Sequence, residues 1–250
     1  MRFADKVALV TGGGSGIGRA TALAFAREGA RVVVAGRSRE PLEQTVKLAE
    51  EAGGRAAAIT ADVTRAADVQ RLVAGAVATY GSLDVAVNNA GVFTAGQAAE
   101  IDEDDWAFTF AVNTTGVMLS MKYEIAHMLT AGGGVIVNIA SQIGAHQRIP
   151  GLGAYGASKA AVAALTRTAA LEYIRQGIRI NVVSPGAHDT TMSMRPGETE
   201  ADRAERMRDS LPAGRVGTLE EAAGAILWIA SPEAGFAVGH DLVVDGGAAL

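Results

Sequence analysis

Short runs of apolar, mostly β-branched residues recur along the chain and alternate with longer segments of helical periodicity. The runs occupy residues 7–10, 32–35, 56–60, 83–87, 135–140, 178–183 and 242–244. The helical segments occupy residues 17–28, 41–52, 66–80, 103–129, 157–175 and 220–230. Strands that alternate with helices at this spacing indicate βαβ units and a parallel sheet. Because the runs are continuously apolar, we expect strands that are buried on both faces.

This order predicts an α/β fold in which a seven-stranded parallel sheet is flanked by helices, as a single-domain, doubly wound Rossmann fold. No Pro/Ser-rich linker or repeat divides the chain, so we expect a single domain over residues 1–250. Residues 186–212 interrupt the alternation of strands and helices, because they are polar and rich in Met and Arg. They follow a strand's carboxyl end, where such sheets bind ligands, so we expect a substrate lid. A surface excursion with one charged helix is the alternative.

Composition excludes several classes of function. The net charge is −5 and no basic stripe is visible, so we expect no nucleic acid partner. The chain has no cysteine, which excludes disulfides, thiolate metal sites and a cysteine nucleophile. The four histidines are scattered and form no metal motif. No stretch approaches the ~18 uncharged apolar residues of a membrane span, so we expect a cytoplasmic protein without a membrane partner.

A glycine-rich loop lies between the first apolar run and the first helical segment. Gly12 permits a tight turn, Gly16 lets the backbone approach a pyrophosphate, and Gly18 lets the helix pack closely on the sheet. The N–H groups that begin the helix then face the phosphates. Because the loop joins a strand to a helix within a βαβ unit, it predicts a dinucleotide site. A flexible glycine turn without a ligand is the alternative.

Tyr155 and Lys159 are four residues apart, so they share one face if this segment is helical. A free tyrosine has a pKa near ~10 and is a poor base at neutral pH. A neighbouring ammonium group favours the phenolate and lowers that pKa, which would suit general acid/base catalysis. The same pair also occurs on ordinary surface helices, so its interpretation depends on the other motifs.

The spacing of the loop glycines resembles the T-G-x-x-x-G-x-G motif of the classical short-chain dehydrogenase/reductase family. Further motifs of that family follow in order over nearly the whole chain. They are Asp62-Val63, Asn88-Asn89-Ala90-Gly91, Asn113, Ser141, Tyr155-x-x-x-Lys159, Pro185-Gly186, Gly214-Arg215 with Glu220-Glu221, and Val244-Asp245-Gly246-Gly247. The resemblance implies an oxidoreductase that moves hydride between a nicotinamide cofactor and a secondary alcohol or ketone. It also implies a homotetramer.

The resemblance assigns roles to the catalytic candidates. Tyr155 would protonate the carbonyl oxygen during reduction, or take the hydroxyl proton during oxidation. Lys159 would tune Tyr155 and hold the nicotinamide ribose. Ser141, at the end of a strand, would orient the carbonyl, and Asn113 would hold a water molecule that relays protons. The alternatives are that Ser141 only caps a helix or turn, and that Asn113 only bonds the backbone.

The cofactor-binding residues expected from the resemblance are Gly12, Ser15, Gly16, Ile17, Gly18, Arg37, Asp62, Val63, Asn89, Ala90, Gly91, Tyr155, Lys159, Pro185, Gly186, His188 and Thr190. Gly36 stands where NAD-preferring members carry an acid that binds the ribose 2′-hydroxyl. Arg37 follows and can pair with a 2′-phosphate. We therefore favour NADP(H), with NAD(H) as the alternative. Ser15 argues the other way, because many NADP-dependent members have a second basic residue there.

The substrate is the least determined part of the site. We expect its pocket walls from residues 93–97, 142–154 and 188–212, which contain His146 and His188 as candidate contacts. Ser141 lies fourteen residues before Tyr155, one more than the resemblance leads us to expect. These walls select no substrate beyond a small or medium secondary alcohol or ketone. A non-catalytic nucleotide-binding regulator on the same fold is the alternative function, and the complete set of catalytic residues favours the enzyme.

Overall fold

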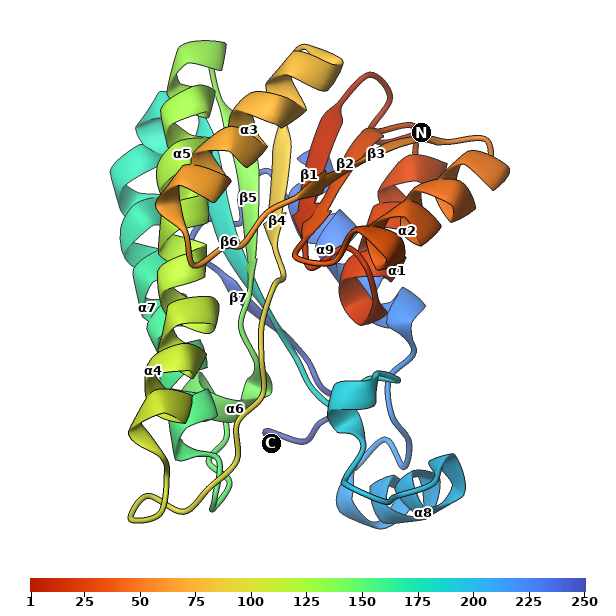
Figure 1. The fold of residues 1–250 in the computed structure, drawn as a ribbon, viewed down its shortest axis with the longest axis vertical. Coiled ribbons are helices and arrows are strands. Elements are labelled where there is room, and N and C mark those ends of the chain that lie inside the picture. The colour runs from red at the N-terminus through yellow and green to blue at the C-terminus, as the bar shows by residue number, and fades with distance from the viewer.

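The protein forms one seven-stranded parallel sheet in the order β3-β2-β1-β4-β5-β6-β7 (Figure 1). The structure is a computed structural model that describes residues 1–250. The strands are β1 (Val7–Thr11), β2 (Arg31–Gly36), β3 (Arg55–Thr60), β4 (Val85–Asn88), β5 (Gly134–Ile139), β6 (Ile178–Pro185) and β7 (Asp241–Val244). The chain winds outward from β1 to β3, then returns to β4 beside β1 and winds the other way. The predicted doubly wound α/β fold is confirmed, and each strand boundary lies within two residues of its predicted position.

Helices cover both faces of the sheet (Figure 1). On one face lie α1 (Gly16–Arg27), α2 (Arg39–Glu51) and α9 (Leu219–Ala230), and on the other lie α3 (Ala66–Tyr80), α5 (Gly116–Ala131) and α7 (Gly153–Tyr173). The shorter elements are α4 (Glu103–Phe110), η1 (Ala111–Thr115), α6 (Gln142–Ala145), η2 (Ile174–Gln176), η3 (Thr191–Ser193), α8 (Glu200–Ser210) and η4 (Pro232–Ala234). Both α6 and α8 lie beyond the carboxyl ends of the strands (Figure 1). None of these helices combines the length and the apolar character that crossing a membrane requires.

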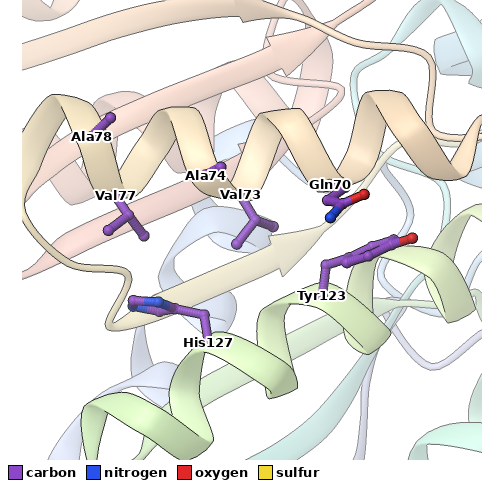
Figure 2. Close-up of a pocket in the computed structure, with 7 residues that line it drawn as sticks. All are labelled: Gln70, Val73, Ala74, Val77, Ala78, Tyr123 and His127. Atoms are coloured by element: carbon purple, nitrogen blue, oxygen red, sulfur yellow. The ribbon is translucent and has the colours of Figure 1, made fainter.

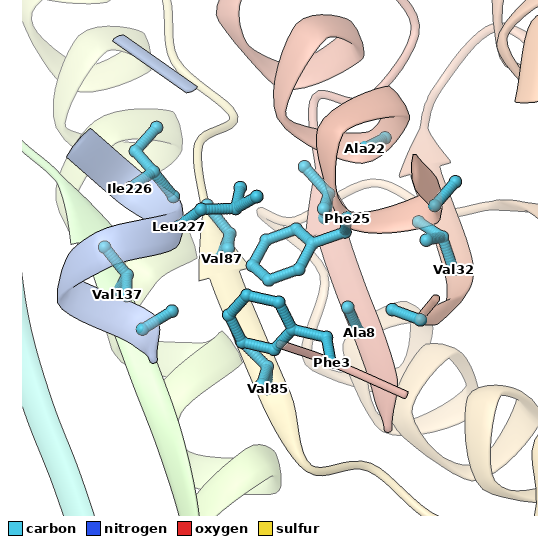
Figure 3. Packing of buried hydrophobic residues seen from close by; sticks show 14 of the residues in the cluster. Phe3, Ala8, Ala22, Phe25, Val32, Val85, Val87, Val137, Ile226 and Leu227 are labelled. Atoms are coloured by element: carbon cyan, nitrogen blue, oxygen red, sulfur yellow. The ribbon is translucent and has the colours of Figure 1, made fainter. Parts of the chain in front are cut away.

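The core has two apolar layers, one on each face of the sheet, with 21 buried residues apiece. In the layer under α1 and α9, the rings of Phe3 and Phe25 pack edge to face at 4.7 Å (Figure 3). Every residue of β1 and β6 is buried, as the continuous apolar runs predicted. The edge strands β3 and β7 are only partly buried, since each lacks a neighbour on one side.

Two predicted helices differ from the structure in ways that matter for the site. The segment 103–129 is not one helix: α4 and α5 are separated by the π-helical turn η1. Asn113 occupies this turn, and its side chain bonds to groups outside the helix, as π-turns at functional sites often allow. The helix predicted for residues 157–175 starts four residues earlier than expected, at Gly153, so Tyr155 lies in its first turn.

Candidate active site

A cavity of about 980 Å³ lies at the carboxyl ends of the central strands. Of the predicted cofactor residues, it is lined by Gly12, Ser15, Gly16, Ile17, Asn89, Ala90, Gly91, Tyr155, Lys159, Pro185, Gly186, His188 and Thr190. The structure therefore brings together residues that are spread over most of the chain. Four other predicted residues, Gly18, Arg37, Asp62 and Val63, lie outside the lining.

The glycine loop at one end of the cavity fits a phosphate group. Gly12 has a φ of +66°, and a Cβ atom there would lie 2.7 Å from the Asn89 Nδ2 atom, so only glycine suits the position. Ser15 precedes α1 in an extended conformation and makes no capping hydrogen bond, and the first turn of α1 carries no acidic residue. The first N–H groups of α1 thus remain free for an anion. Gly18 packs against the Gly12 carbonyl, so it sets the approach of helix to loop rather than contacting a ligand.

Arg19 also holds this loop in place, a role that was not predicted from the sequence. Its guanidinium donates to the carbonyl oxygens of Gly14 and Pro41, and its Nε donates to Thr45 Oγ1 at 3.0 Å. Thr45 in turn donates to the Gly13 carbonyl at 2.9 Å. The carbonyl oxygens of Gly13 and Gly14 therefore have donors within the protein. Only the position of Arg19 directly after the glycine motif could have suggested this.

The adenine side of the predicted site is more exposed. Arg37 is solvent-exposed and forms no ion pair with any carboxylate of the protein. A Cβ atom on Gly36 would meet only Leu42, at 3.5 Å, so the space at the end of β2 is open. Asp62 uses one carboxylate oxygen to accept from the N–H and hydroxyl of Thr64. Val63 packs against Gly116 at the start of α5.

Asn113 is completely buried behind the cavity. Its Oδ1 accepts from the Val92 N–H at 2.8 Å, and its Nδ2 donates to the Val92 carbonyl at 2.9 Å and to Ser158 Oγ at 3.0 Å. It ties η1 to both the segment after β4 and to α7. A Cβ atom on Gly91 would lie 3.3 Å from Asn113 Oδ1 and 3.3 Å from Lys159 Nζ, so both groups border Gly91.

Ser141 lies directly before α6, two residues beyond the end of β5, and lines the cavity. Its hydroxyl accepts from the Ile143 N–H at 3.1 Å, so it does cap a turn, as the structural alternative held. The same side chain partly offsets the rise in the Tyr155 pKa that burial causes. A hydroxyl that accepts from the backbone keeps its own proton free, so capping and donation to a substrate oxygen are compatible.

Tyr155 and Lys159 lie one turn apart on α7, and both line the cavity. Burial raises the pKa of Tyr155, and the nearby Ser141 side chain acts in the opposite direction. Burial also lowers the pKa of Lys159 to about 8. In this structure burial and the Ser141 side chain account for the direction of the Tyr155 pKa, and the expected tuning of that pKa by Lys159 stays a prediction. The low-dielectric surroundings penalise both charged forms, and the Lys159 ammonium group donates instead to the Ile139 carbonyl at 2.9 Å.

The segment after β6 closes the cavity on its other side. The His188 ring is 3% exposed and packs against Gly217, where a Cβ atom would lie 2.7 Å from the ring. His188 Nδ1 lies 3.1 Å from the Gly186 carbonyl, which can only accept, so Nδ1 carries the proton. Thr190 reaches the glycine loop, because its Cγ2 atom would lie 3.2 Å from a Cβ on Gly16.

The two candidate histidines have different positions. His188 lines the cavity, whereas His146 does not and instead pairs with Asp241 of β7 at 2.9 Å. The remaining walls are largely apolar, from Val92, Phe93, Ile143, Ile149, Pro150, Leu152, Met192, Met194, Met207, Leu211 and Leu219. Phe93 packs on the Tyr155 ring at 5.0 Å. Leu219 and Ala248 also line the cavity but lie outside the predicted wall segments, because only the tertiary fold brings them there.

A second hollow, of about 430 Å³, lies between α3 and α5 and is lined by Gln70, Val73, Ala74, Val77, Ala78, Tyr123 and His127 (Figure 2). Figure 2 shows that its side chains come from only these two helices, and none belongs to a predicted motif. The structure holds no group of three or more His, Cys, Asp or Glu side chains that could bind a metal ion. The catalytic candidates therefore concentrate in the larger cavity.

Comparison with known proteins identifies the family. The profile of the family described as enoyl-(acyl carrier protein) reductase matches residues 12–249. The chain belongs to the short-chain dehydrogenase/reductase family. It is 42% identical over 247 residues to the cis-4-hydroxycyclohexanecarboxylate dehydrogenase of Sinomonas cyclohexanicum, with 98% of this chain and 97% of that protein covered. It is 41% identical over 246 residues to the cyclohexanol dehydrogenase of an Acinetobacter species, with 98% and 95% covered.

A solved structure shares both the fold and the family. The short-chain type dehydrogenase/reductase of Mycobacterium marinum superimposes with a TM-score of 0.93 at 35% sequence identity, with 98% of this chain and 96% of that chain covered. Like its short-chain dehydrogenase/reductase relatives, the protein is an NAD(P)-dependent oxidoreductase that acts on the alcohol/ketone pair.

Proposed function

We propose that this enzyme interconverts alicyclic secondary alcohols and their ketones, with NADP(H) preferred over NAD(H). The observation that carries the proposal is the single cavity in which Ser141, Tyr155 and Lys159 face the cofactor residues. The walls around them are mostly apolar, which favours a substrate with a hydrocarbon ring. Two relatives named for cyclohexane-ring substrates support the same class.

The catalytic roles follow from the positions of the side chains. Tyr155, whose pKa is raised by burial, holds a proton at neutral pH and can give it to a carbonyl oxygen during reduction. Ser141 donates a second hydrogen bond that holds that oxygen in place. Lys159 and Asn113 flank Gly91, where Lys159 would hold the ribose and Asn113 would help to position a relay water. The nicotinamide, when bound, supplies or accepts the hydride.

The open end of β2 supports the cofactor preference. Gly36 leaves room for a 2′-phosphate, and the unpaired guanidinium of Arg37 follows it. Ser38, which precedes α2, makes no capping hydrogen bond, so the N–H groups of that helix are free for an anion as well. A guanidinium and a helix N-terminus together favour phosphate over hydroxyl.

We propose that residues 186–212 act as the substrate lid. Two arginines of α8 form hydrogen bonds to other residues of this segment. Arg203 is 7% exposed, and it donates to Asp189 Oδ1 at 2.6 Å and to Ser193 Oγ at 3.0 Å. It therefore links α8 to the 189–193 stretch. Arg206 pairs with Glu198 and donates to the Ser193 carbonyl. These contacts let α8 and the 189–193 stretch move as one unit.

A homotetramer is also proposed. Exposed apolar side chains gather on α4 and α5, where Trp106, Phe108, Met118 and Leu129 each have more than a third of their surface accessible. Such a patch favours contact with a second copy of the chain. Light scattering coupled to size-exclusion chromatography would test the assembly, and a monomer at micromolar concentration would contradict it. The cytoplasmic location stays a prediction of the sequence.

The activity is tested with a panel of alcohols and ketones, with NADP(H) and NAD(H) in parallel, read by the absorbance of the reduced nicotinamide. We expect cyclohexanol to be oxidised faster than a linear primary alcohol, and NADP+ to give the higher kcat/KM. A tenfold preference for NAD+ would contradict the role of Arg37. Failure to turn over any alicyclic alcohol or ketone with either cofactor would contradict the proposed substrate class.

A further inference from the structure

The residue after Ser141 places an unpartnered hydrogen-bond acceptor in the wall of the cavity. Gln142 lines the cavity and is only 6% exposed. Its Oε1 atom is shielded from solvent and accepts no hydrogen bond from the protein. Buried carbonyl oxygens nearly always have a donor, so one that lacks it beside a reacting centre points to a donor on the ligand.

The orientation of the Gln142 amide is fixed by a relay of hydrogen bonds. Gln147 Nε2 donates to the Ala248 carbonyl at 2.7 Å, and a carbonyl can only accept. The Gln147 Oε1 atom therefore faces Gln142 and accepts from its Nε2 at 3.0 Å. The amide nitrogen of Gln142 is thereby committed to Gln147, and the oxygen is the atom left over.

The loop that carries this relay is held in one conformation by its own backbone. The Gln147 N–H donates to the Gln142 carbonyl at 2.8 Å, and the Gly144 N–H donates to the Gln147 carbonyl at 2.8 Å. Gly144 has a φ of +124°, and a Cβ there would collide with the Gly156 carbonyl of α7. The backbone around Gln142 is thus preorganised.

The surroundings of Gln142 Oε1 offer no alternative donor. A Cβ atom on Gly186 would lie 2.5 Å from Oε1, so the oxygen rests against a cavity residue that must be glycine. The Gly186 N–H already donates to the Val244 carbonyl at 2.8 Å. The next residue along the loop, Ile143, also lines the cavity and is apolar. A ligand group placed here must therefore bring its own N–H or O–H.

We propose that Gln142 is a specificity-determining residue whose Oε1 accepts a hydrogen bond from a second hydroxyl group of the substrate. Because Gln142 and Ser141 both line the cavity, this hydroxyl belongs near the reacting carbinol, as in a cyclic 1,2-diol or its hydroxy ketone. The oxygen lies just behind the cavity surface, and the hydroxyl reaches it through a small shift of the side chain. A carbonyl, ether or halogen in the same place would bring a second acceptor against Oε1, so a substrate that carries one there is disfavoured. The inference rests on the proposed function and narrows its substrate class.

The test compares cyclohexanol with the isomers of cyclohexane-1,2-diol as substrates of the wild-type enzyme and three variants. Gln142→Met removes the acceptor with little change in size. Gln147→Met leaves the acceptor in place but frees its amide to flip. Arg148→Met is the matched control, because Arg148 is exposed on the same loop and does not line the cavity. The readout is the ratio of kcat/KM for diol over cyclohexanol, measured at saturating cofactor.

We expect the best diol isomer to be favoured about tenfold over cyclohexanol in the wild type, as one additional neutral hydrogen bond allows. Gln142→Met should lower this ratio about tenfold. Gln147→Met should lower the ratio partly, and Arg148→Met should leave it unchanged. A ratio that is the same in wild type and Gln142→Met for every isomer would overturn the proposal.

Two further outcomes are distinguished. A rise in the cofactor KM that is equal for both substrates in Gln142→Met, without a change in the ratio, would show that the donor is the cofactor carboxamide and would also overturn the proposal. If the wild type turns over neither substrate, the proposed function fails separately. Binding then decides the role of Gln142, by the Tm shift that each ligand causes in the presence of cofactor. The diol must raise the Tm more than cyclohexanol in the wild type and not in Gln142→Met.

Discussion

The two ends of the cavity are built differently. The cofactor end consists of a glycine loop, the N-terminus of α1 and the ends of β1 and β4, and it presents mainly backbone groups. The substrate end consists of side chains from residues 142–152 and from the 186–212 segment. Gln147 of the first is held by the Ala248 carbonyl, and Asp189 of the second is held by Arg203. A site built from backbone groups restricts which residue each of its positions can hold. A wall built from side chains can change its residues without a change of fold. Tyr155 stands at the junction of the two ends.

The largest expected effect is that of Tyr155→Phe. Loss of the acid/base group should reduce kcat by about 10²–10⁴-fold, because general acid/base catalysis contributes this much. Cofactor affinity, measured by fluorescence quenching or calorimetry, should stay within a few-fold because the backbone-built end is untouched. Turnover that persists near the wild-type rate would show that the proton passes through another group.

Gly18→Ala tests the backbone-built end. A Cβ atom there would collide with the Gly12 carbonyl and lie 2.5 Å from Asn89 Nδ2, so loop and helix must move apart. We expect a loss of about 1–3 kcal/mol in the free energy of unfolding together with weaker cofactor binding. The matched control is Gly224→Ala in α9, where nothing lies within 4 Å of the added atom. It should be neutral or slightly stabilising. Equal behaviour of the two variants in urea unfolding would contradict the close packing at Gly18.

Gly36→Asp tests whether the cofactor preference resides at one position. The new side chain has room, since its Cβ would meet only Leu42 at 3.5 Å. A carboxylate there should repel a 2′-phosphate and accept from a 2′-hydroxyl, so the NADP/NAD ratio of kcat/KM should fall about tenfold or more. Arg37→Ala should lower the ratio less, because it removes attraction without adding repulsion. An unchanged ratio in both variants would place the discrimination elsewhere.

The pH dependence tests the junction of the two ends. Oxidation needs the deprotonated phenol of Tyr155, and burial raises its pKa, so kcat/KM for oxidation should increase with pH through the neutral and alkaline range. Reduction needs the protonated phenol, so its kcat/KM should stay level over the same range and fall only at high pH. Lys159, with its pKa lowered to about 8, loses its charge in the same interval in the cofactor-free enzyme. An oxidation rate that falls with rising pH would contradict the assignment of Tyr155 as the base.

The smallest expected effect comes from the substrate end, with Arg203→Met. Removal of its hydrogen bonds to Asp189 and Ser193 should loosen the lid and raise KM for substrate and cofactor about three- to tenfold, with kcat less affected. Arg208→Met on the same helix is the control, because Arg208 is exposed and forms no ion pair. Indistinguishable KM values for the two variants would show that Arg203 does not hold the lid in place.

Much of this protein was determined by its sequence alone. The strands, their burial and the parallel sheet follow from periodicity, because a buried βαβ unit requires apolar runs at fixed spacing. The cofactor loop could be placed from Gly12 and Gly16 because a positive φ and a close backbone approach admit little else.

Tertiary structure decided the rest. The π-turn around Asn113, the raised pKa of Tyr155 and the separate positions of His146 and His188 depend on partners distant in sequence. The free acceptor of Gln142 is the clearest case, since its orientation is set by Ala248, about a hundred residues away, as one long-range hydrogen bond shows. Local geometry restricts which residues a backbone-built site can use, so these residues form a motif that can be recognised in the sequence. Long-range side-chain hydrogen bonds and the desolvation of individual polar groups arise only from packing, and so no sequence pattern predicts them.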